Sequence, residues 1–192
     1  MLIGAASKRT ATFLQVSLDT GARCGEISKL QWTYVNTVNL TISINNPEKN
    51  SRSRTIPVTQ KCIAMLQALP RKYDPYIFNP NVKSIMNSFT CLRERLAIIQ
   101  RNPRFKQIHL HSFRHFYACN LFRKTKNLKT VQDALGHKSI MNTEIYTRLV
   151  VFRDEEYYSA TAKTVEEVRK LAEDGWSFFC EIDGTKIFRK PK

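Results

Sequence analysis

Residues 109–115 contain side chains well suited to binding a phosphate oxyanion. His111 and Arg114 are three positions apart, so on a helix they share one face and converge on one anion. His111 and His115 are four apart, a spacing that also occurs in zinc sites. No Glu lies between these histidines, no Cys flanks them, and the cationic Arg114 would repel a dication, so we expect an oxyanion site without metal.

A second arginine, Arg23, lies at a glycine-flanked turn before a predicted helix over residues 26–32. The free amides and the positive dipole end of a helix, joined to a planar guanidinium, suit a phosphate oxyanion. Glu26 lies one turn further on and is expected to support that guanidinium. Taken alone, Arg23 is more typical of an ordinary surface arginine beside a helix cap.

Residues 48–54 form the basic, polar tip of a predicted hairpin. Lys49 on such an arm can reach into a DNA groove and give a proton to a leaving oxygen. Arg52 and Arg54 are expected to contact DNA from the same tip. The competing interpretation is a solvated turn whose charges protect a sheet edge from aggregation.

Two further candidates follow residue 130. His137 lies in a Leu-Gly-His run, next to Lys138, which we expect to contact DNA, and Tyr146 begins a Tyr-Thr-Arg-Leu run. A core or capping histidine is the alternative for His137 and for His115. A core aromatic, the commonest fate of a tyrosine at helical spacing, is the alternative for Tyr146.

Hydrophobic periodicity predicts the elements that must position these residues. A helix is expected to stop at Gly21, a Val/Thr/Ile-rich strand to precede the hairpin tip, and a second strand to follow it. The predicted helices cover 9–19, 26–32, 60–69, 82–100, 112–123, 128–136 and 139–148, and the predicted strands cover 35–44 and 54–58.

The charge distribution favours nucleic acid as the partner. The chain carries a net charge of +15, and residues 1–150 hold 23 Lys and Arg against 7 Asp and Glu, whereas residues 151–192 hold 8 against 9. Cations set against phosphates release condensed counterions, so a basic excess of this size is typical of a protein that binds a polyphosphate. A soluble basic protein or one that binds acidic lipid is the alternative.

Length and composition limit the organisation of the chain. With 192 residues and 42% hydrophobic content, it can bury one main core with a small appendage. It has no membrane-length apolar run and no secretory signal, so we expect a soluble, cytoplasmic protein. Its five cysteines are scattered without a CxxC pair, which argues against disulfides and zinc.

The last 42 residues differ in kind from the rest, so we expect two domains, 1–150 and a C-terminal extension, 151–192. Residues 164–167 form a capping-box pattern that opens a helix ending near Gly175. Residues 178–188 surround Asp183-Gly184, a strong two-residue hairpin turn. The extension is therefore predicted to be a helix followed by a β-hairpin.

In order and spacing, residues 10–150 resemble the catalytic domain of the tyrosine recombinase (phage integrase) family. Residues 20–30 resemble its first arginine box, and Lys49 falls where its hairpin lysine does. Residues 111–115 resemble its His-x-x-Arg box, and residues 135–137 resemble its next histidine motif. Tyr146 lies nine residues after His137, as the family's nucleophile does. Each box alone is weak, but five in the correct order make coincidence improbable. Cys24 and Phe113 depart from the usual aliphatic residues.

The resemblance implies an α+β, mainly helical catalytic fold with a small antiparallel sheet. It also implies metal-free DNA cleavage by Tyr146 without a cofactor, in a site where the phosphate is surrounded by Arg23, Lys49, His111, Arg114 and His137. The protein is then expected to form a synaptic tetramer on double-stranded DNA and to associate with the nucleoid of the host cell. The extension resembles that of archaeal virus and plasmid integrases. An inactive DNA-binding relic and a type IB topoisomerase remain the alternatives.

Overall fold

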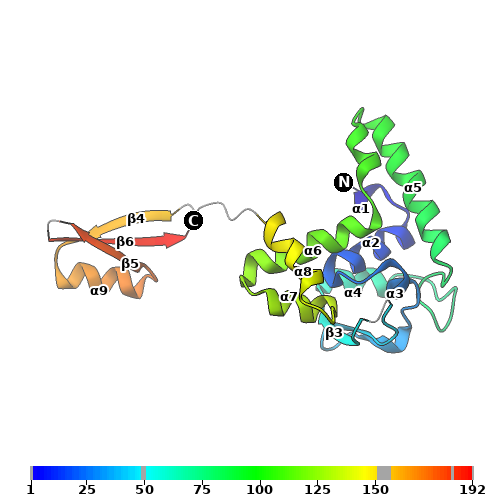
Figure 1. The fold of residues 1–192 in the computed structure, drawn as a ribbon, viewed down its shortest axis with the longest axis horizontal. Helices are drawn as coiled ribbons and strands as arrows, with labels where there is room; N and C mark the ends of the chain where they lie inside the picture. Colours follow the sequence, from blue (N-terminus) through cyan, green and yellow to red (C-terminus); the bar gives the residue numbers. More distant parts are fainter. Residues whose placement is uncertain (1, 49–50, 151–156, 183, 192) are drawn as a thin grey trace. The chain divides into compact units, whose positions relative to one another are not determined.

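The computed structural model describes residues 2–48, 51–150, 157–182 and 184–191. The chain forms two compact units, an N-terminal unit (Met1–Val150) and a C-terminal unit (Val151–Lys192) (Figure 1). Most of the described chain is helical and the strands form two small antiparallel sheets, which confirms the predicted fold class. No helix among the described residues has both the length and the apolar character that a membrane span needs.

The N-terminal unit is built mainly from helices, with one three-stranded sheet. Its described elements are α1 (Leu2–Ala5), α2 (Lys8–Thr20), α3 (Cys24–Ser28), η1 (Trp32–Tyr34), β1 (Val35–Asn36), β2 (Thr41–Ile44), β3 (Arg54–Pro57), α4 (Gln60–Gln67), α5 (Val82–Ile99), η2 (Pro103–Gln107), α6 (Leu110–Thr125), α7 (Leu128–Leu135) and α8 (Met141–Leu149).

Helix α2 runs through the middle of the unit and ends where the first site residue begins. Phe13 packs in a cluster with the sheet and α4, while Leu14 packs in a second cluster with α5 and α6. Gly21 ends the helix with φ +60°, a conformation that favours glycine, and a Cβ there would overlap the ring of Tyr117 on α6. Ala22 and Arg23 follow directly.

The sheet differs from the predicted single strand over residues 35–44. The structure has two strands, β1 and β2, with a turn between them, because the Asn36 side chain accepts hydrogen bonds from the backbone N–H groups of Val38 (3.0 Å) and Asn39 (2.8 Å). Strand β2 pairs with β1 on one side and with β3 on the other, all antiparallel. Ile42 on β2 and Ile56 on β3 are cross-strand partners, and both are buried in the core.

The predicted helix over 26–32 is also shorter in the structure, where α3 ends at Ser28. The next residues pair with a distant segment instead of continuing the helix. The Ile77 N–H donates to the Leu30 carbonyl (2.9 Å), and the Trp32 N–H donates to the Pro75 carbonyl (3.2 Å). Tertiary pairing therefore takes the backbone groups that a longer helix would have used.

Helices α6, α7 and α8 surround a third cluster. Its buried members include Ala118 and Phe122 of α6, Val131 of α7 and Tyr146 of α8. Asn127 caps α7 by accepting from two backbone N–H groups, and Gly136 ends it with φ +69°. This packing brings α8 against α6.

The C-terminal unit contains β4 (Tyr157–Ala162), α9 (Val165–Glu173), β5 (Ser177–Ile182) and β6 (Thr185–Pro191), and its sheet order is β4-β6-β5. The predicted capping box is present, since Thr164 and Glu167 bond each other's backbone N–H groups. The predicted hairpin is β5 and β6, although Asp183 of its turn lies outside the described residues. Strand β4 was not predicted, and its pairing with β6 extends the hairpin to three strands.

Candidate active site

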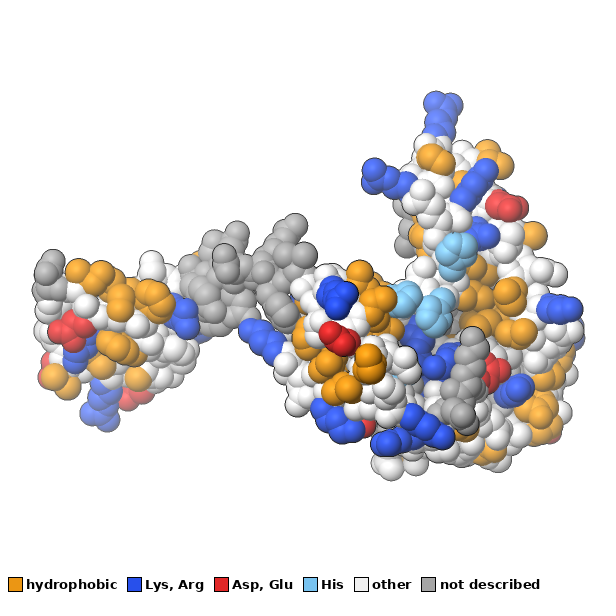
Figure 2. Space-filling model, in the orientation of Figure 1, with side chains coloured by type: hydrophobic (Ala, Val, Ile, Leu, Met, Phe, Trp, Pro, Cys, Tyr) orange, Lys and Arg blue, Asp and Glu red, His pale blue; other side chains and the backbone are white. Residues whose placement is uncertain are grey.

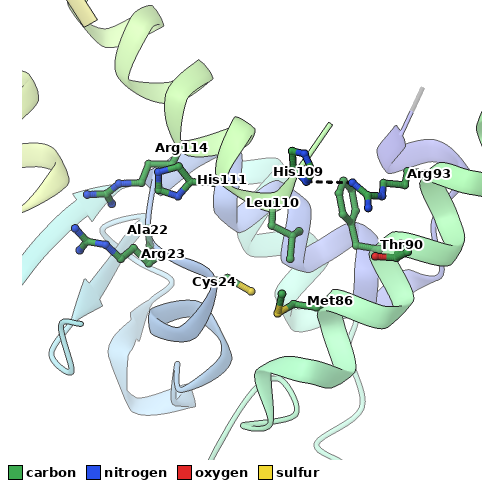
Figure 3. A pocket seen from close by; sticks show the side chains of 11 residues that line it. Ala22, Arg23, Cys24, Met86, Thr90, Arg93, His109, Leu110, His111 and Arg114 are labelled. Atoms are coloured by element: carbon green, nitrogen blue, oxygen red, sulfur yellow. Dashed lines mark hydrogen bonds between the residues drawn. The ribbon is translucent and has the colours of Figure 1, made fainter. Parts of the chain in front are cut away.

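Arg23, His111 and Arg114 line one cavity of about 320 Å³ in the N-terminal unit (Figure 3). In the close view, these three side chains lie side by side at one end of the cavity, while Arg93 and His109 lie at the other end. Segments about 90 residues apart in the sequence thus meet at one site. The cavity is also lined by Ala22, Cys24, Met86, Phe89, Thr90 and Leu110.

Arg23 is the N-cap residue of α3, in an extended conformation (φ −70°, ψ 152°). Its Nη1 donates to Glu26 Oε1 (3.3 Å) and to the Glu48 carbonyl (3.3 Å), and also to the Ser51 hydroxyl. The side chain keeps 17% exposure. Its guanidinium is therefore held by α3 and by both sides of the hairpin tip, and it still reaches solvent.

Glu26 is the buried carboxylate that ties these elements together, and its side chain has 0% exposure. It accepts from the Arg23 backbone N–H (2.8 Å), from the Glu48 backbone N–H (3.2 Å) and from Arg54 Nη2 (2.7 Å). Burial alone would raise the pKa of Glu26, but these bonds and the charge of Arg54 hold the pKa below its usual value. Glu26 is thus ionised and supports Arg23, as expected from its spacing.

Arg54 lies differently from the exposed DNA contact that we expected. Its side chain is only 5% exposed, and its guanidinium donates to Glu26. A buried cation needs a partner, so the Glu26 carboxylate draws Arg54 inward from the tip of β3. Arg54 therefore braces the site through Glu26, and its contact with DNA stays a prediction.

We expect Glu26→Gln to lower the free energy of unfolding at neutral pH by about 3 kcal/mol, because it leaves the buried Arg54 without its counterion. The pKa of Glu26 is depressed in the folded state, so its contribution is present above its ordinary value of 4.5 and is lost as the pH falls through the folded value. Urea unfolding at neutral and acidic pH measures both effects. Equal acid sensitivity of the variant and the wild type would contradict this role.

The hairpin tip is fastened to the turn that carries His137. The Arg52 backbone N–H donates to the Gly136 carbonyl (2.9 Å), and a Cβ at Gly136 would lie 2.8 Å from the Arg52 carbonyl oxygen. The side chains of Arg52 and Lys138 are exposed, as a DNA contact requires. Lys49 and Asn50 lie outside the described residues, so the predicted proton donor has no position here.

Arg114 is the most deeply enclosed cation of the site, with 2% exposure. Its Nη1 donates to the Gly21 carbonyl (2.6 Å), and its Nη2 donates to the Leu135 carbonyl (2.9 Å) and lies 2.9 Å from His137 Nε2. Burial and then the charges of Arg23 and Arg54 lower the pKa of Arg114 to about 10. It remains a cation at neutral pH and joins the ends of α2 and α7.

His137 lies between Arg114 and α8 and is 8% exposed. Its Nδ1 is 2.9 Å from the Thr143 hydroxyl oxygen. Burial and then the charges of Arg114, Arg23 and Arg54 lower the pKa of His137 to about 4, while Glu26 acts in the opposite direction. The ring is therefore neutral at physiological pH.

Tyr146 adjoins the same cluster through the histidines of α6. The rings of His111 and His115 lie 4.7 Å apart, and those of His115 and Tyr146 lie 5.7 Å apart. Tyr146 is 2% exposed. Burial raises its pKa, and the charges of Arg114 and Arg23 lower it in part. For His115, burial and then the charge of Arg114 lower the pKa, so the ring that contacts the phenol favours the neutral imidazole.

Two polar residues of the site have no counterpart among the predicted ones. Ser51 binds the guanidinium of Arg23, and Thr143 binds the ring of His137. Sequence spacing gave no sign of either contact, because each joins two segments. Among the residues that the structure describes, no group of three His, Cys, Asp or Glu side chains could hold a metal ion.

Taken together, Arg23, His111 and Arg114 line one cavity, and His137 bonds Arg114. The Tyr146 ring meets this cluster through its contact with His115, whose ring also contacts His111. Guanidinium forks bind the oxygens of a phosphate in pairs, and fixed donors of this kind stabilise the charge that develops at a phosphorus centre during transfer. The arrangement is suited to attack by a phenol on a phosphodiester.

Residues 2–151 match the phage integrase family over most of the chain. This chain belongs to the phage integrase family. Its curated relatives include a tyrosine recombinase of Thermosipho africanus, which is 29% identical over 84% of this chain and 58% of its own length. The tyrosine recombinase XerC of Xanthomonas axonopodis pv. citri is 27% identical over 73% of this chain and 47% of its own length. The chain thus spans about half the length of these relatives.

Solved structures agree with the assignment at the level of the fold. The crystal structure of XerA recombinase has a TM-score of 0.64 and 21% identity, and the match covers 93% of this chain and 62% of that protein. The family resemblance predicted from the five boxes is therefore confirmed by the match to residues 2–151.

Proposed function

We propose that the N-terminal unit cleaves and rejoins double-stranded DNA as a site-specific recombinase or integrase. In this reaction the Tyr146 phenolate attacks a scissile phosphate, a 3′-phosphotyrosine bond forms, and the bond to the 5′-oxygen breaks. The departing oxygen takes a proton and leaves as a hydroxyl group. The observation that carries the proposal is the convergence of Arg23, His111, Arg114 and His137 beside a buried tyrosine.

In this mechanism each side chain of the site has a chemical role. Free tyrosine is a poor nucleophile at neutral pH, and Arg114 and Arg23 are the charges that lower the pKa of Tyr146 against its burial. The same two guanidiniums bind the non-bridging oxygens. His111 relays the phenolic proton, His137 hydrogen-bonds a phosphoryl oxygen, and Lys49 protonates the leaving oxygen.

DNA as the substrate is supported by charge. Figure 2 shows histidine side chains and Lys and Arg side chains gathered around a hollow in the N-terminal unit, whose sequence holds the whole basic excess of the chain. The Tn1549 transposon integrase, with a TM-score of 0.61 and 18% identity over 85% of this chain and 58% of that one, was solved in complex with transposon right end DNA. We expect Arg52 and Lys138 to contact phosphates.

Assembly, location and origin remain predictions. We expect a synaptic tetramer on DNA, because recombination joins two duplexes that each need two cleavages. We also expect a cytoplasmic, nucleoid-associated protein. The resemblance of the C-terminal unit to archaeal virus and plasmid integrases predicts that kind of source.

We expect the chain to form a covalent adduct with a nicked attachment-site duplex, in which loss of a short 5′ fragment prevents religation, and to do so equally well in EDTA. The adduct survives detergent, whereas a DNA-binding relic shifts the DNA without forming one. A type IB topoisomerase would instead relax supercoiled DNA that lacks an attachment site. Cleavage that stops in EDTA and returns with Mg²⁺ would contradict the metal-free reaction.

A further inference from the structure

The hydrogen bonds around His137 determine which of its ring nitrogens carries the proton. Arg114 Nη2 lies 2.9 Å from His137 Nε2, and a guanidinium nitrogen can only donate. If Nε2 carried a proton, two donors would face each other at that distance. Nε2 is therefore the bare acceptor of the neutral ring, and the proton is on Nδ1.

Thr143 accepts the hydrogen bond of that Nδ1–H group. Its hydroxyl oxygen lies 2.9 Å from His137 Nδ1, and the residue is fully buried, with 0% exposure. Water is thus a poor competitor for the bond. The hydrogen bond that one imidazole nitrogen makes determines the tautomer and the orientation of the ring. The contact with Thr143 therefore controls which nitrogen faces the site.

Thr143 also connects His137 to the helix of the nucleophile. It lies on α8, three residues before Tyr146, so the two side chains share a face of that helix. Both are buried. A single hydroxyl thus joins the His137 turn to the helix turn that carries the phenol.

We propose that Thr143 is a positioning residue of the site. Its hydroxyl accepts a hydrogen bond from the Nδ1–H group of His137, so that the bare Nε2 faces Arg114. The same bond holds α8 against the His137 turn. The expected effect of Thr143 on cleavage rests on the proposed function. Its hydrogen bond to His137 and its hold on α8, the structural half of the proposal, do not. With Nε2 bare, His137 binds Arg114 in the DNA-free protein. It donates to a phosphoryl oxygen only after Nε2 has gained a proton from solvent.

Thr143 suits both states of the ring. The hydroxyl accepts the Nδ1 proton from the neutral ring and from the imidazolium alike. The charged groups that act on this ring are Arg114 of α6, Arg23 and Glu26 of α3, and Arg54 of β3. A bound phosphate would offset the three cations and accept the hydrogen bond of Arg114 Nη2 in place of Nε2, so the ring can take up its second proton without turning.

Three substitutions on α8 test the proposal. Thr143→Val removes the hydroxyl with little change of shape, and Thr143→Ser keeps it. Thr147→Val is the matched control, because the Thr147 hydroxyl bonds only the Glu144 carbonyl of its own helix (2.7 Å) among the contacts described. Thermal unfolding of each variant reports whether it folds.

The first readout is the nitrogen-15 NMR pattern of His137 in the full chain without DNA. We expect wild type, Thr143→Ser and Thr147→Val to show protonated Nδ1 and bare Nε2, and Thr143→Val to lose this fixed pattern. A wild-type ring protonated at Nε2 would overturn the proposal even if Thr143→Val failed to fold. So would a folded Thr143→Val protein with the unchanged pattern.

The second readout is the single-turnover rate of adduct formation on the nicked duplex. We expect Thr143→Val to be about tenfold slower, as for loss of one buried hydrogen bond, with unchanged DNA affinity, and Thr143→Ser to stay within about threefold of wild type. Equal rates for the Val and wild-type proteins would overturn the catalytic half. If the wild type itself formed no adduct, the proposed function would fail, while the NMR pattern would still decide the structural half.

Discussion

Tyr146→Phe abolishes covalent capture of a nicked DNA substrate and leaves DNA affinity almost unchanged: this is the largest single effect that we expect. The substitution removes only the hydroxyl, so the nucleophilic oxygen is lost while the ring remains. Tyr146 is 2% exposed and packs with Ala118, Phe122 and Leu135, an environment that phenylalanine fills equally well. Denaturing gel electrophoresis of the labelled duplex measures capture, and a mobility shift measures affinity.

Tyr117→Phe is the matched control for this experiment. Tyr117 is a partly buried tyrosine of the same unit, and its ring packs against Gly21. We expect that variant to keep capture at the wild-type level. Capture by Tyr146→Phe at a comparable level would end the assignment of residue 146 as the nucleophile.

Arg114→Ala is expected to slow cleavage by about a hundredfold or more, the cost of removing one preorganised donor from a developing oxyanion. The same change leaves the Gly21 and Leu135 carbonyls and His137 Nε2 without their donor in the buried site. We therefore expect a lower melting temperature as well. Single-turnover cleavage, measured well below that temperature, separates the two effects.

Two further variants make the Arg114 result specific. Arg114→Lys keeps the charge but cannot bond three groups with one planar fork, so we expect most of the cleavage defect to persist. Arg123→Ala removes an exposed arginine from the same helix, and we expect cleavage within about twofold of wild type once DNA is saturating. Wild-type cleavage by Arg114→Ala would remove this residue from the site.

Local sequence signals predicted where several helices of the two units begin or end. Gly21 and Gly136 each end a helix in the left-handed conformation, and Thr164 opens one with a capping box. Such signals act within a few residues of the element that they define, so one sequence suffices to find them. The spacing of His111 and Arg114 was predictive for the same reason, since both lie on α6.

Local sequence patterns do not predict contacts between distant segments. The strand expected over 35–44 is divided by a turn that Asn36 stabilises, and strand β4 exists through its pairing with β6. Arg54 was expected at the DNA surface, but a carboxylate 28 residues earlier draws it inside. Thr143 carried no sequence signal, because its role depends on the ring that it meets.

Identification of the residue that carries the DNA is the most direct test of Tyr146 as the nucleophile. Protease digestion of the adduct formed by the wild-type chain, followed by mass spectrometry, locates the nucleotide on one peptide. We predict a phosphodiester bond between the 3′ end of the cleaved strand and the oxygen of Tyr146. A nucleotide attached to Tyr117, Tyr157, Tyr158 or any other side chain would contradict it.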